Sequence, residues 1–128
     1  MENQNKLVLQ RFLACAANRD RAGQAELLHD DIRVFEAQSL PFAGEHIGKE
    51  AFFTLVKRVF TQWDDVEMKT QQFIAEGDTV VLLATMHGRG RQRGESFSMA
   101  IAEVWRFRDG KIAAIQPYYY DTKRLLEW

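Results

Sequence analysis

The spacing of the apolar residues changes about half-way along the chain, and this change limits the folds that the chain can adopt. In the first half, apolar residues recur every three or four positions, as expected of helices. In the second half they alternate or run together between turn-forming residues, which is typical of strands. The sequence therefore predicts an α+β protein in which helices come first and most of a sheet follows.

The first half contains three predicted helices and one short strand. The first helix has about 15 residues and ends near Asn18, and a second fits residues 22–28. A brief strand spans 32–35, and Pro41, Gly44 and Gly48 mark a loop. The clearest helix follows, with one apolar stripe that should face the core; its members are Phe52, Leu55, Val56, Val59, Phe60 and Trp63.

The second half predicts a four-stranded antiparallel meander over residues 66–74, 79–87, 96–107 and 112–120. The run 79–87 is almost continuously apolar, which indicates a strand buried on both faces. Such a sheet, curved around a helix, forms a cone with a pocket at its open end. We find no linker or repeat, so the chain is expected to be one domain, 1–128.

Composition excludes several classes of protein. The 128 residues carry a net charge of −1, without the basic excess typical of nucleic-acid-binding domains. A single cysteine, Cys15, excludes an internal disulfide. The three histidines have no metal-ligand spacing, so we expect neither metal nor cofactor. No membrane span or signal peptide is predicted, and a cytoplasmic protein is expected. The arginine-rich segment 88–94 lacks the spacing of a dinucleotide-binding loop and is interpreted as a solvated hairpin loop.

Glu103 is the most informative residue of the predicted sheet. One face of its strand is bulky and apolar apart from this single carboxyl group, and carries Phe97, Met99, Ile101, Trp105 and Phe107. A carboxylate in such surroundings is desolvated, so its pKa should rise unless a cation or a donor partners it. A raised carboxyl pKa suits general acid–base chemistry near neutral pH. A glutamate tied to an arginine, or one at a wet pocket mouth, is the structural alternative.

The register of the last hairpin decides which groups join Glu103. A two-residue turn at Asp109-Gly110 would place Glu103 opposite Gln116. A three-residue loop with a glycine bulge would place it opposite Ile115, with Tyr119 and Asp121 on its side. A slip of one residue reverses every side chain, and the sequence leaves both registers open.

The segment 103–112, followed by residues 118–121, resembles the last hairpin of the nuclear transport factor 2-like superfamily. Within it the chain is most similar to the SnoaL-like polyketide cyclases and the ketosteroid-isomerase-related proteins. Residues 18–36 and 44–53 resemble the first half of that group, so the likeness covers nearly the whole chain. It implies a cone-shaped fold, and because this fold hosts unrelated activities it implies much less about the reaction.

The resemblance also suggests roles for individual residues. It implies that Glu36 stands where ketosteroid isomerases place an aspartate base, and Glu103 where they place a protonated aspartic acid. Phe12 occupies the position of a tyrosine that completes their oxyanion hole, and it has no hydroxyl. Asp121 matches the general acid–base aspartate of SnoaL-like cyclases, and this match favours the three-residue loop with a glycine bulge, which places Tyr119 in the pocket. Asp121 is also suited to be the N-cap of a short C-terminal helix.

These residues together predict an apolar pocket with three acidic groups. Glu36, Glu103 and Asp121 are the candidate catalytic residues. The candidate substrate-binding residues are Phe12, Trp63, His87, Met99, Trp105, Ile115 and Tyr119. The predicted function is cofactor-free proton transfer, of isomerase or cyclase type, on an apolar carbonyl-bearing small molecule. The alternative is a non-catalytic module that binds a small ligand in the same cavity, and the loss of the hydroxyl at Phe12 favours it.

The outer face of the predicted sheet is also partly apolar. Ala100, Ala102 and Val104 lie on it, and a monomer would leave them uncovered. We therefore expect a homodimer formed through the sheets.

Overall fold

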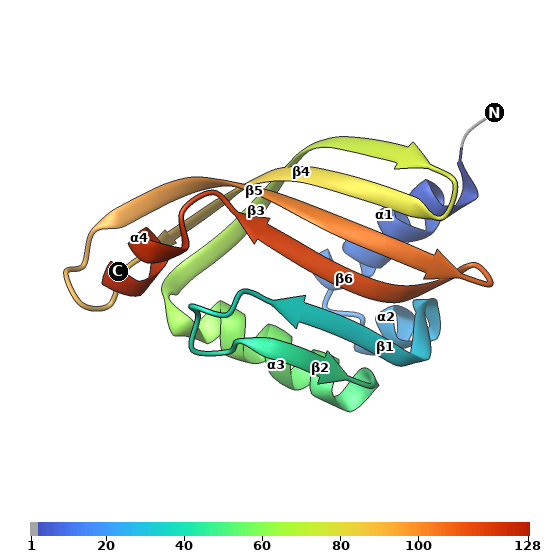
Figure 1. Cartoon of the computed structure of the whole chain (residues 1–128), viewed down its shortest axis with the longest axis horizontal. Coiled ribbons are helices and arrows are strands. Elements are labelled where there is room, and N and C mark those ends of the chain that lie inside the picture. Colours follow the sequence, from blue (N-terminus) through green and yellow to red (C-terminus); the bar gives the residue numbers. More distant parts are fainter. Residues whose placement is uncertain (1–2) are drawn as a thin grey trace.

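The computed structural model describes residues 3–128, which form four helices and a six-stranded sheet (Figure 1). In chain order the elements are α1 (Gln4–Ala17), α2 (Arg21–Leu27), β1 (Leu28–Glu36), β2 (Gly44–Ile47), α3 (Lys49–Gln62), β3 (Asp64–Glu76), β4 (Thr79–Arg89), β5 (Ser96–Arg108), β6 (Lys111–Tyr119) and α4 (Thr122–Glu127). The predicted α+β class is confirmed, and the predicted elements occur in the predicted order, with strand β2 in addition.

The helices begin and end where local chemistry indicates. Asn3 caps α1 by accepting from the N–H groups of Asn5 and Lys6, and Asp20 caps α2 by accepting from that of Gly23. In α3 the predicted stripe is confirmed only in part. Its members Phe52, Leu55 and Val59 are buried, whereas Phe60 is 43% exposed.

The strand β2 is absent from the prediction, which assigned its residues to a loop. It pairs antiparallel with the end of β1, from Arg33 opposite Ile47 to Glu36 opposite Gly44. Glycines at both ends have positive φ, 96° at Gly44 and 96° at Gly48, which explains why the segment looked like a turn. A four-residue edge strand forms because β1 offers it a partner, and that is a tertiary effect.

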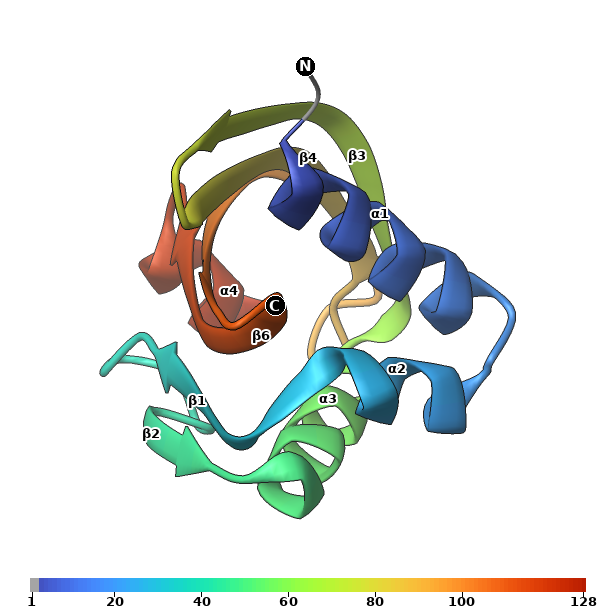
Figure 2. The ribbon, with the colours of Figure 1, turned by 90° about the vertical axis from the view of Figure 1, so that its right-hand side faces the viewer.

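The sheet has the order β2-β1-β6-β5-β4-β3, and β1 runs parallel to β6 whereas all other neighbours are antiparallel. Figure 2 shows this sheet curling around the interior, while α1, α2 and α3 close its open side. The core lies between them and includes Leu9 of α1, Leu55 of α3 and Met86 of β4. The predicted cone is thus confirmed.

One prediction about β4 is wrong. The strand is not buried on both faces, because burial alternates strictly along it. Val80, Leu82, Ala84 and Met86 face the core, while the residues between them are only half-buried. The apolar run is continuous because Val81 and Leu83, on the outward face of β4, are apolar as well, and both are half-buried.

The C-terminal helix α4 covers one end of the cone and explains the glycine- and arginine-rich loop. Trp128 stacks on Phe97 with ring centroids 4.3 Å apart, and its backbone oxygen accepts from the N–H of Gln92 at 3.2 Å. A methyl group on Gly90 would come within 2.5 Å of that oxygen. Arg91 pairs with Asp64 at 3.1 Å. The loop 88–94 therefore packs against Trp128 at the end of α4.

The last hairpin follows neither predicted register along its whole length. Its turn has two residues, since Arg108 faces Lys111. A bulge between Arg106 and Phe107 then adds one residue to β6, so that Glu103 lies opposite Pro117. The bulge reverses the side-chain faces, and Tyr119 shares the inner face with Glu103.

Candidate functional site

Glu103 lies on the inner face of β5, as its strand pattern predicts. Its neighbours along that face, Ile101 and Trp105, are buried, and the Trp105 indole N–H donates to the Glu103 carboxyl at 3.3 Å. Burial raises the pKa of Glu103 to about 7, and the bond from Trp105 opposes this rise without cancelling it. No arginine partners it among residues 3–128.

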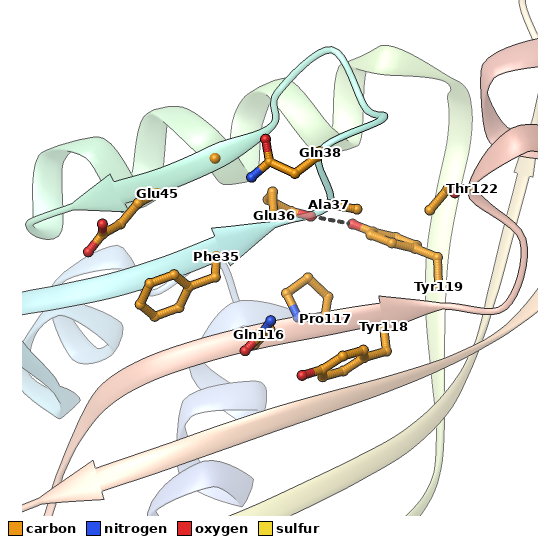
Figure 3. Close-up of a pocket in the computed structure, with 11 residues that line it drawn as sticks. Phe35, Glu36, Ala37, Gln38, Glu45, Gln116, Pro117, Tyr118, Tyr119 and Thr122 are labelled. Carbon is orange, nitrogen blue, oxygen red and sulfur yellow. Dashed lines mark hydrogen bonds between the residues drawn. The ribbon is translucent and has the colours of Figure 1, made fainter.

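Glu36 ends β1 and is 7% exposed, so its side chain is more completely covered than that of Glu103, which is half-buried. The Tyr119 hydroxyl donates to its carboxyl at 3.0 Å (Figure 3). Burial raises the pKa of Glu36 to about 7, and the negative charge of Glu103 adds to the rise. The bonds from Tyr119 and from the backbone of Ala37 oppose it.

Tyr119 is held as a proton donor by the same surroundings. Burial, followed by the proximity of Glu36 and Glu103, raises the pKa of the Tyr119 phenol far above its ordinary value. Its hydroxyl therefore stays protonated throughout the physiological pH range.

The negative charge of Glu103 contributes to the raised pKa of Glu36, so the two carboxyl groups influence each other's ionisation. Electrostatic repulsion is reciprocal, so the charge of either group makes ionisation of the other harder. Because the pKa values of Glu36 and Glu103 are both raised to about 7, each carboxyl group is present in ionised and in protonated form near neutral pH.

A cavity of about 510 Å³ lies at the seam between β1 and β6, and Glu36 and Tyr119 are part of its wall (Figure 3). The parallel pairing of the two strands is last seen between Val34 and Ile115. Pro117 lies two residues beyond and has no N–H to donate, and the strands separate there. We name this cavity the seam pocket; its lining residues are Phe35, Glu36, Ala37, Gln38, Gly44, Glu45, Gln116, Pro117, Tyr118, Tyr119 and Thr122.

Most of the predicted apolar site residues belong to the core instead of this pocket. Their exposed fractions are 2–6%, and they are Phe12, Trp63, Met99, Trp105 and Ile115. Phe12, for instance, packs edge-to-face against Trp105 with centroids 5.5 Å apart. The Trp63 indole donates to the backbone oxygen of Leu125. Of the seven predicted binding residues, only Tyr119 lines the seam pocket.

Two further predicted site residues lie elsewhere. His87 points to the outer face of β4, opposite Glu67 and Ser98, because the core-facing positions alternate with it. Asp121 is the N-cap of α4 and accepts from the Arg124 N–H at 3.2 Å. The structure therefore brings Glu36, Glu103 and Tyr119 close together and leaves His87 and Asp121 outside the group. Glu36 and Tyr119 line the seam pocket, whereas Glu103 is not part of its lining.

The polar part of the seam pocket was not predicted from the sequence. Gln38, Gln116 and Thr122 line it, and none belongs to a recognisable motif. Pro117 was the available signal, since a proline inside a strand usually marks an edge or an irregularity.

Within the described chain, no cluster of three or more His, Cys, Asp or Glu side chains is arranged to hold a metal ion. No helix of residues 3–128 is long and apolar enough to span a membrane.

The model of the SnoaL-like domain family matches residues 9–115. This chain belongs to that family. The match covers the two glutamates and ends before Tyr119 and α4. No curated protein sequence matches the chain.

Solved structures share the fold over nearly its whole length. A nuclear transport factor 2-like protein of unknown function from Burkholderia pseudomallei has a TM-score of 0.87 at 20% identity, covering 98% of this chain and 97% of its own. A putative SnoaL-like polyketide cyclase from Jannaschia has a TM-score of 0.82 at 16% identity, with 96% and 89% covered.

A third structure, a protein with a ketosteroid isomerase-like fold from Catenulispora acidiphila in complex with trimethylamine, has a TM-score of 0.71 at 18% identity, with 88% and 84% covered. At these identities the likeness shows a common fold, while the fold itself supports many activities.

Proposed function

We propose that this SnoaL-like protein catalyses cofactor-free proton transfer on a carbonyl-bearing small molecule bound at the seam pocket. The observation that carries the proposal is the pair of neighbouring inward-directed carboxyl groups, Glu36 and Glu103, which both lie near the Tyr119 hydroxyl and whose pKa values are both raised to about 7. A base and an acid of that strength are matched to proton transfer at neutral pH.

The surroundings of the two carboxyls suggest a division of roles. Glu36 accepts a hydrogen bond from Tyr119, which favours its ionised form, so Glu36 is the base. Glu103 lies among apolar side chains with one weak donor, so Glu103 is the acid. This division agrees with the roles implied by the family resemblance.

The proposed step removes a proton from the carbon next to the carbonyl group. Glu36 takes this proton, and the electron pair of the C–H bond moves into the enolate. As Glu36 becomes protonated, the single hydroxyl proton of Tyr119 turns from Glu36 to the developing oxygen anion, which it stabilises more than the neutral carbonyl. Glu103 does not line the seam pocket, so in this proposal its acid form donates to a carbonyl group that reaches past Tyr119. Glu36 returns the proton to the same or to a conjugated carbon, so that no other reactant is consumed.

Exchange of carbon-bound hydrogen tests this proposal. A panel of cyclic ketones and enones is incubated with the protein in D₂O, and loss of the α-proton signal is followed by NMR. We expect wild-type protein to accelerate exchange for some members, and Glu36→Gln to lower that rate by about 100-fold or more. Glu67→Gln, an exposed glutamate of β3, is the matched control. Rates equal to those in buffer across the panel would refute the catalytic role.

A non-catalytic binding module is the second candidate, and Phe12 favours it. The ring of Phe12 packs on Trp105 and supplies no hydroxyl for an oxyanion. The same panel separates the two functions: ligands that bind at the pocket without any accelerated exchange indicate a binder. For Asp121 to act as a catalytic acid or base, the hydrogen bond that its carboxylate accepts from the Arg124 N–H would have to break.

We also propose a homodimer formed through the outer faces of the sheets. The half-exposed outer residues Leu83, Ala102 and Val104 lie on neighbouring strands, and Tyr118 is 53% exposed beside them. Sedimentation should give a dimer at micromolar concentration, and Ala102→Arg should convert it to a monomer. A wild-type monomer would contradict this proposal, as would a dimer that Ala102→Arg leaves intact.

A cytoplasmic location stays a prediction.

A further inference from the structure

Strand β2 leaves one edge of the sheet unpaired. It stands last in the strand order, and its other side pairs with β1. The Gly48 N–H donates to the Ile32 oxygen at 2.8 Å, and bonding alternates along antiparallel strands. The backbone N–H and C=O groups of Glu45 and Ile47 therefore point away from β1, where they can bond to an added strand.

A groove of about 440 Å³ lies between this strand and α3. The helix runs beside β2 in the opposite direction (Figures 1 and 2), and only residue 48 joins the two elements. We name this cavity the edge groove; its walls are His46 and Ile47 of β2 and, from α3, Glu50, Ala51, Thr54, Leu55 and Arg58. It shares no lining residue with the seam pocket. A free strand edge beside a helix is a geometry in which extended peptides bind.

Opposite charges stand at the two ends of the edge groove. Glu50 lies in the first turn of α3, and Arg58 lies about two turns later, where its guanidinium donates to the Pro41 oxygen at 2.8 Å. Among residues 3–128 neither Glu50 nor Arg58 belongs to an ion pair. The neighbouring Lys49 is paired with Asp30 at 3.3 Å. The groove therefore offers a negative charge at one end and a positive charge at the other.

Hydrogen bonds to the loop before β2 hold the groove in shape. His46 Nε2 lies 2.8 Å from the Phe42 oxygen, and because a carbonyl oxygen only accepts, this nitrogen carries the proton. Arg58 bonds to the same loop, so two polar side chains of the wall are fixed without a ligand. A Cβ at Gly44 or at Gly48 would meet no atom of a non-adjacent described residue within 4 Å, so both ends of β2 leave room for a bound chain. A pre-formed site lowers the ordering cost of binding.

The order of the charges selects the direction of a bound chain. Arg58 bonds to Pro41, which precedes β2, whereas Glu50 follows β2 closely. An antiparallel chain therefore begins near Glu50 and ends near Arg58. These two residues are about 12 Å apart along the helix, a distance that a strand covers in about four residues. Residues four apart in a strand share a face, so a basic residue and an acidic residue at that spacing both reach the opposite charge.

The opposite edge of the sheet is less suited to accept a strand. The pairing of β3 is irregular between Asp64 and Glu67 and again between Thr70 and Gln72, and such irregularities protect an edge from added strands. This leaves β2 as the edge that favours strand addition.

We propose that the edge groove binds an extended segment of a partner protein, which adds to β2 as an antiparallel strand and carries a basic residue four positions before an acidic one. The second and fourth residues of this five-residue segment exchange backbone hydrogen bonds with Ile47 and Glu45. The middle residue lies opposite His46 and shares its face, so its side chain meets the wall that Thr54 and Leu55 form. This interaction does not depend on the acid–base site.

Titration of isotope-labelled protein with two short peptides tests the charge pattern. Acetyl-Lys-Thr-Val-Thr-Glu-amide carries the proposed order, and acetyl-Glu-Thr-Val-Thr-Lys-amide has the same composition with the charges exchanged. At low ionic strength, where exposed charges are least screened, we expect the first to bind about fivefold or more tightly than the second. Its largest NMR shifts should fall on the backbone amides of Glu45 and Ile47.

Methylation of single peptide amides tests the strand pairing. N-methylation of either threonine removes a donor to β2 and should weaken binding by about tenfold. N-methylation of the valine, whose N–H points to solvent in this arrangement, is the matched control and should change binding by less than about threefold.

A substitution in α3 tests the charge pairing from the side of the protein. Glu50→Gln should reduce the preference for the first peptide over the second by about threefold, as expected for one exposed ion pair. Glu67→Gln, an exposed glutamate of β3, is the control and should leave the preference unchanged.

Four results would overturn the inference. They are equal binding of the two peptides at low salt, binding that threonine methylation leaves unchanged, largest shifts on β3 instead of β2, and no saturable shift with the first peptide up to its solubility. Shifts at Glu45 and Ile47 that grow with protein concentration without any peptide would also contradict it, because a second copy of the chain would then occupy the edge.

Discussion

Glu103→Gln tests the electrostatic reasoning behind the site most directly, because it keeps the shape of the side chain and removes its ability to ionise. The amide oxygen can still accept the hydrogen bond from Trp105 that the carboxyl now accepts. We expect this variant to be more stable than the wild type at pH 8 and nearly equal to it at pH 5.

The magnitude follows from the pKa of Glu103 in the folded state. Folding raises that pKa from 4.5 to about 7, a change of about 2.5 units, and each unit corresponds to about 1.4 kcal/mol. The folded state holds its proton more tightly than the unfolded state does. The stability associated with this proton is therefore complete below pH 4.5 and is lost as the pH rises through 7. At pH 8 the loss reaches about 3 kcal/mol, and at pH 5 it is below about 1 kcal/mol.

The assay is urea unfolding followed by circular dichroism at pH 5 and pH 8 for the wild type and the variant. The difference between the two proteins cancels the contributions of titrating groups that do not interact with Glu103. Loss of the Glu103 charge also lowers the pKa of Glu36, which adds to the stability of the variant at pH 8 in the same direction. Glu67→Gln serves as the control, because an exposed glutamate should change stability by less than about 0.5 kcal/mol at both pH values.

A stability difference that does not depend on pH would refute the reasoning. It would mean that the Glu103 carboxyl is ionised in the folded protein as readily as in the unfolded chain. The acid role proposed for this residue would fail with it, whereas the fold would be unaffected.

Three other predictions concern residues around the site and the C-terminus. Tyr119→Phe removes the hydroxyl that donates to Glu36, so the pKa of Glu36 should rise further above 7, and carbon-13 NMR of the labelled carboxyl measures it; an unchanged pKa would contradict the assigned bond. Gly90→Ala places a methyl group against the backbone of Trp128, so the free energy of unfolding should fall by about 1–3 kcal/mol, with a change in tryptophan fluorescence; an unaltered spectrum and stability would contradict the packing of the loop 88–94 against Trp128. Asp121→Ala should cost about 1 kcal/mol of unfolding free energy by removing the cap of α4, while Asp121→Asn should restore it; loss of ketone exchange in a stable Asp121→Asn protein would instead assign this residue a catalytic role.

Much of the fold was predictable because it depends on local patterns. The periodicity of Phe52, Leu55 and Val59 is a property of one segment, and it predicts the buried face of α3 wherever that helix packs. The alternation around Glu103 likewise predicts that the residue shares a face with bulky apolar side chains. Strand β2 escaped prediction because it has no pattern of its own and exists through its pairing with β1.

What the chain determined by itself was the set of chemical groups on each element: Glu103 on an apolar strand face, Glu36 at the end of a strand, and Tyr119 near the end of the last one. Only the tertiary structure decided which of these groups meet. A bulge in β6 set the face of Tyr119, and the separation of β1 from β6 opened the pocket beside Glu36. The physical reason is that register and strand separation depend on pairing between segments about 80 residues apart, and side-chain alternation within one segment carries no information about it.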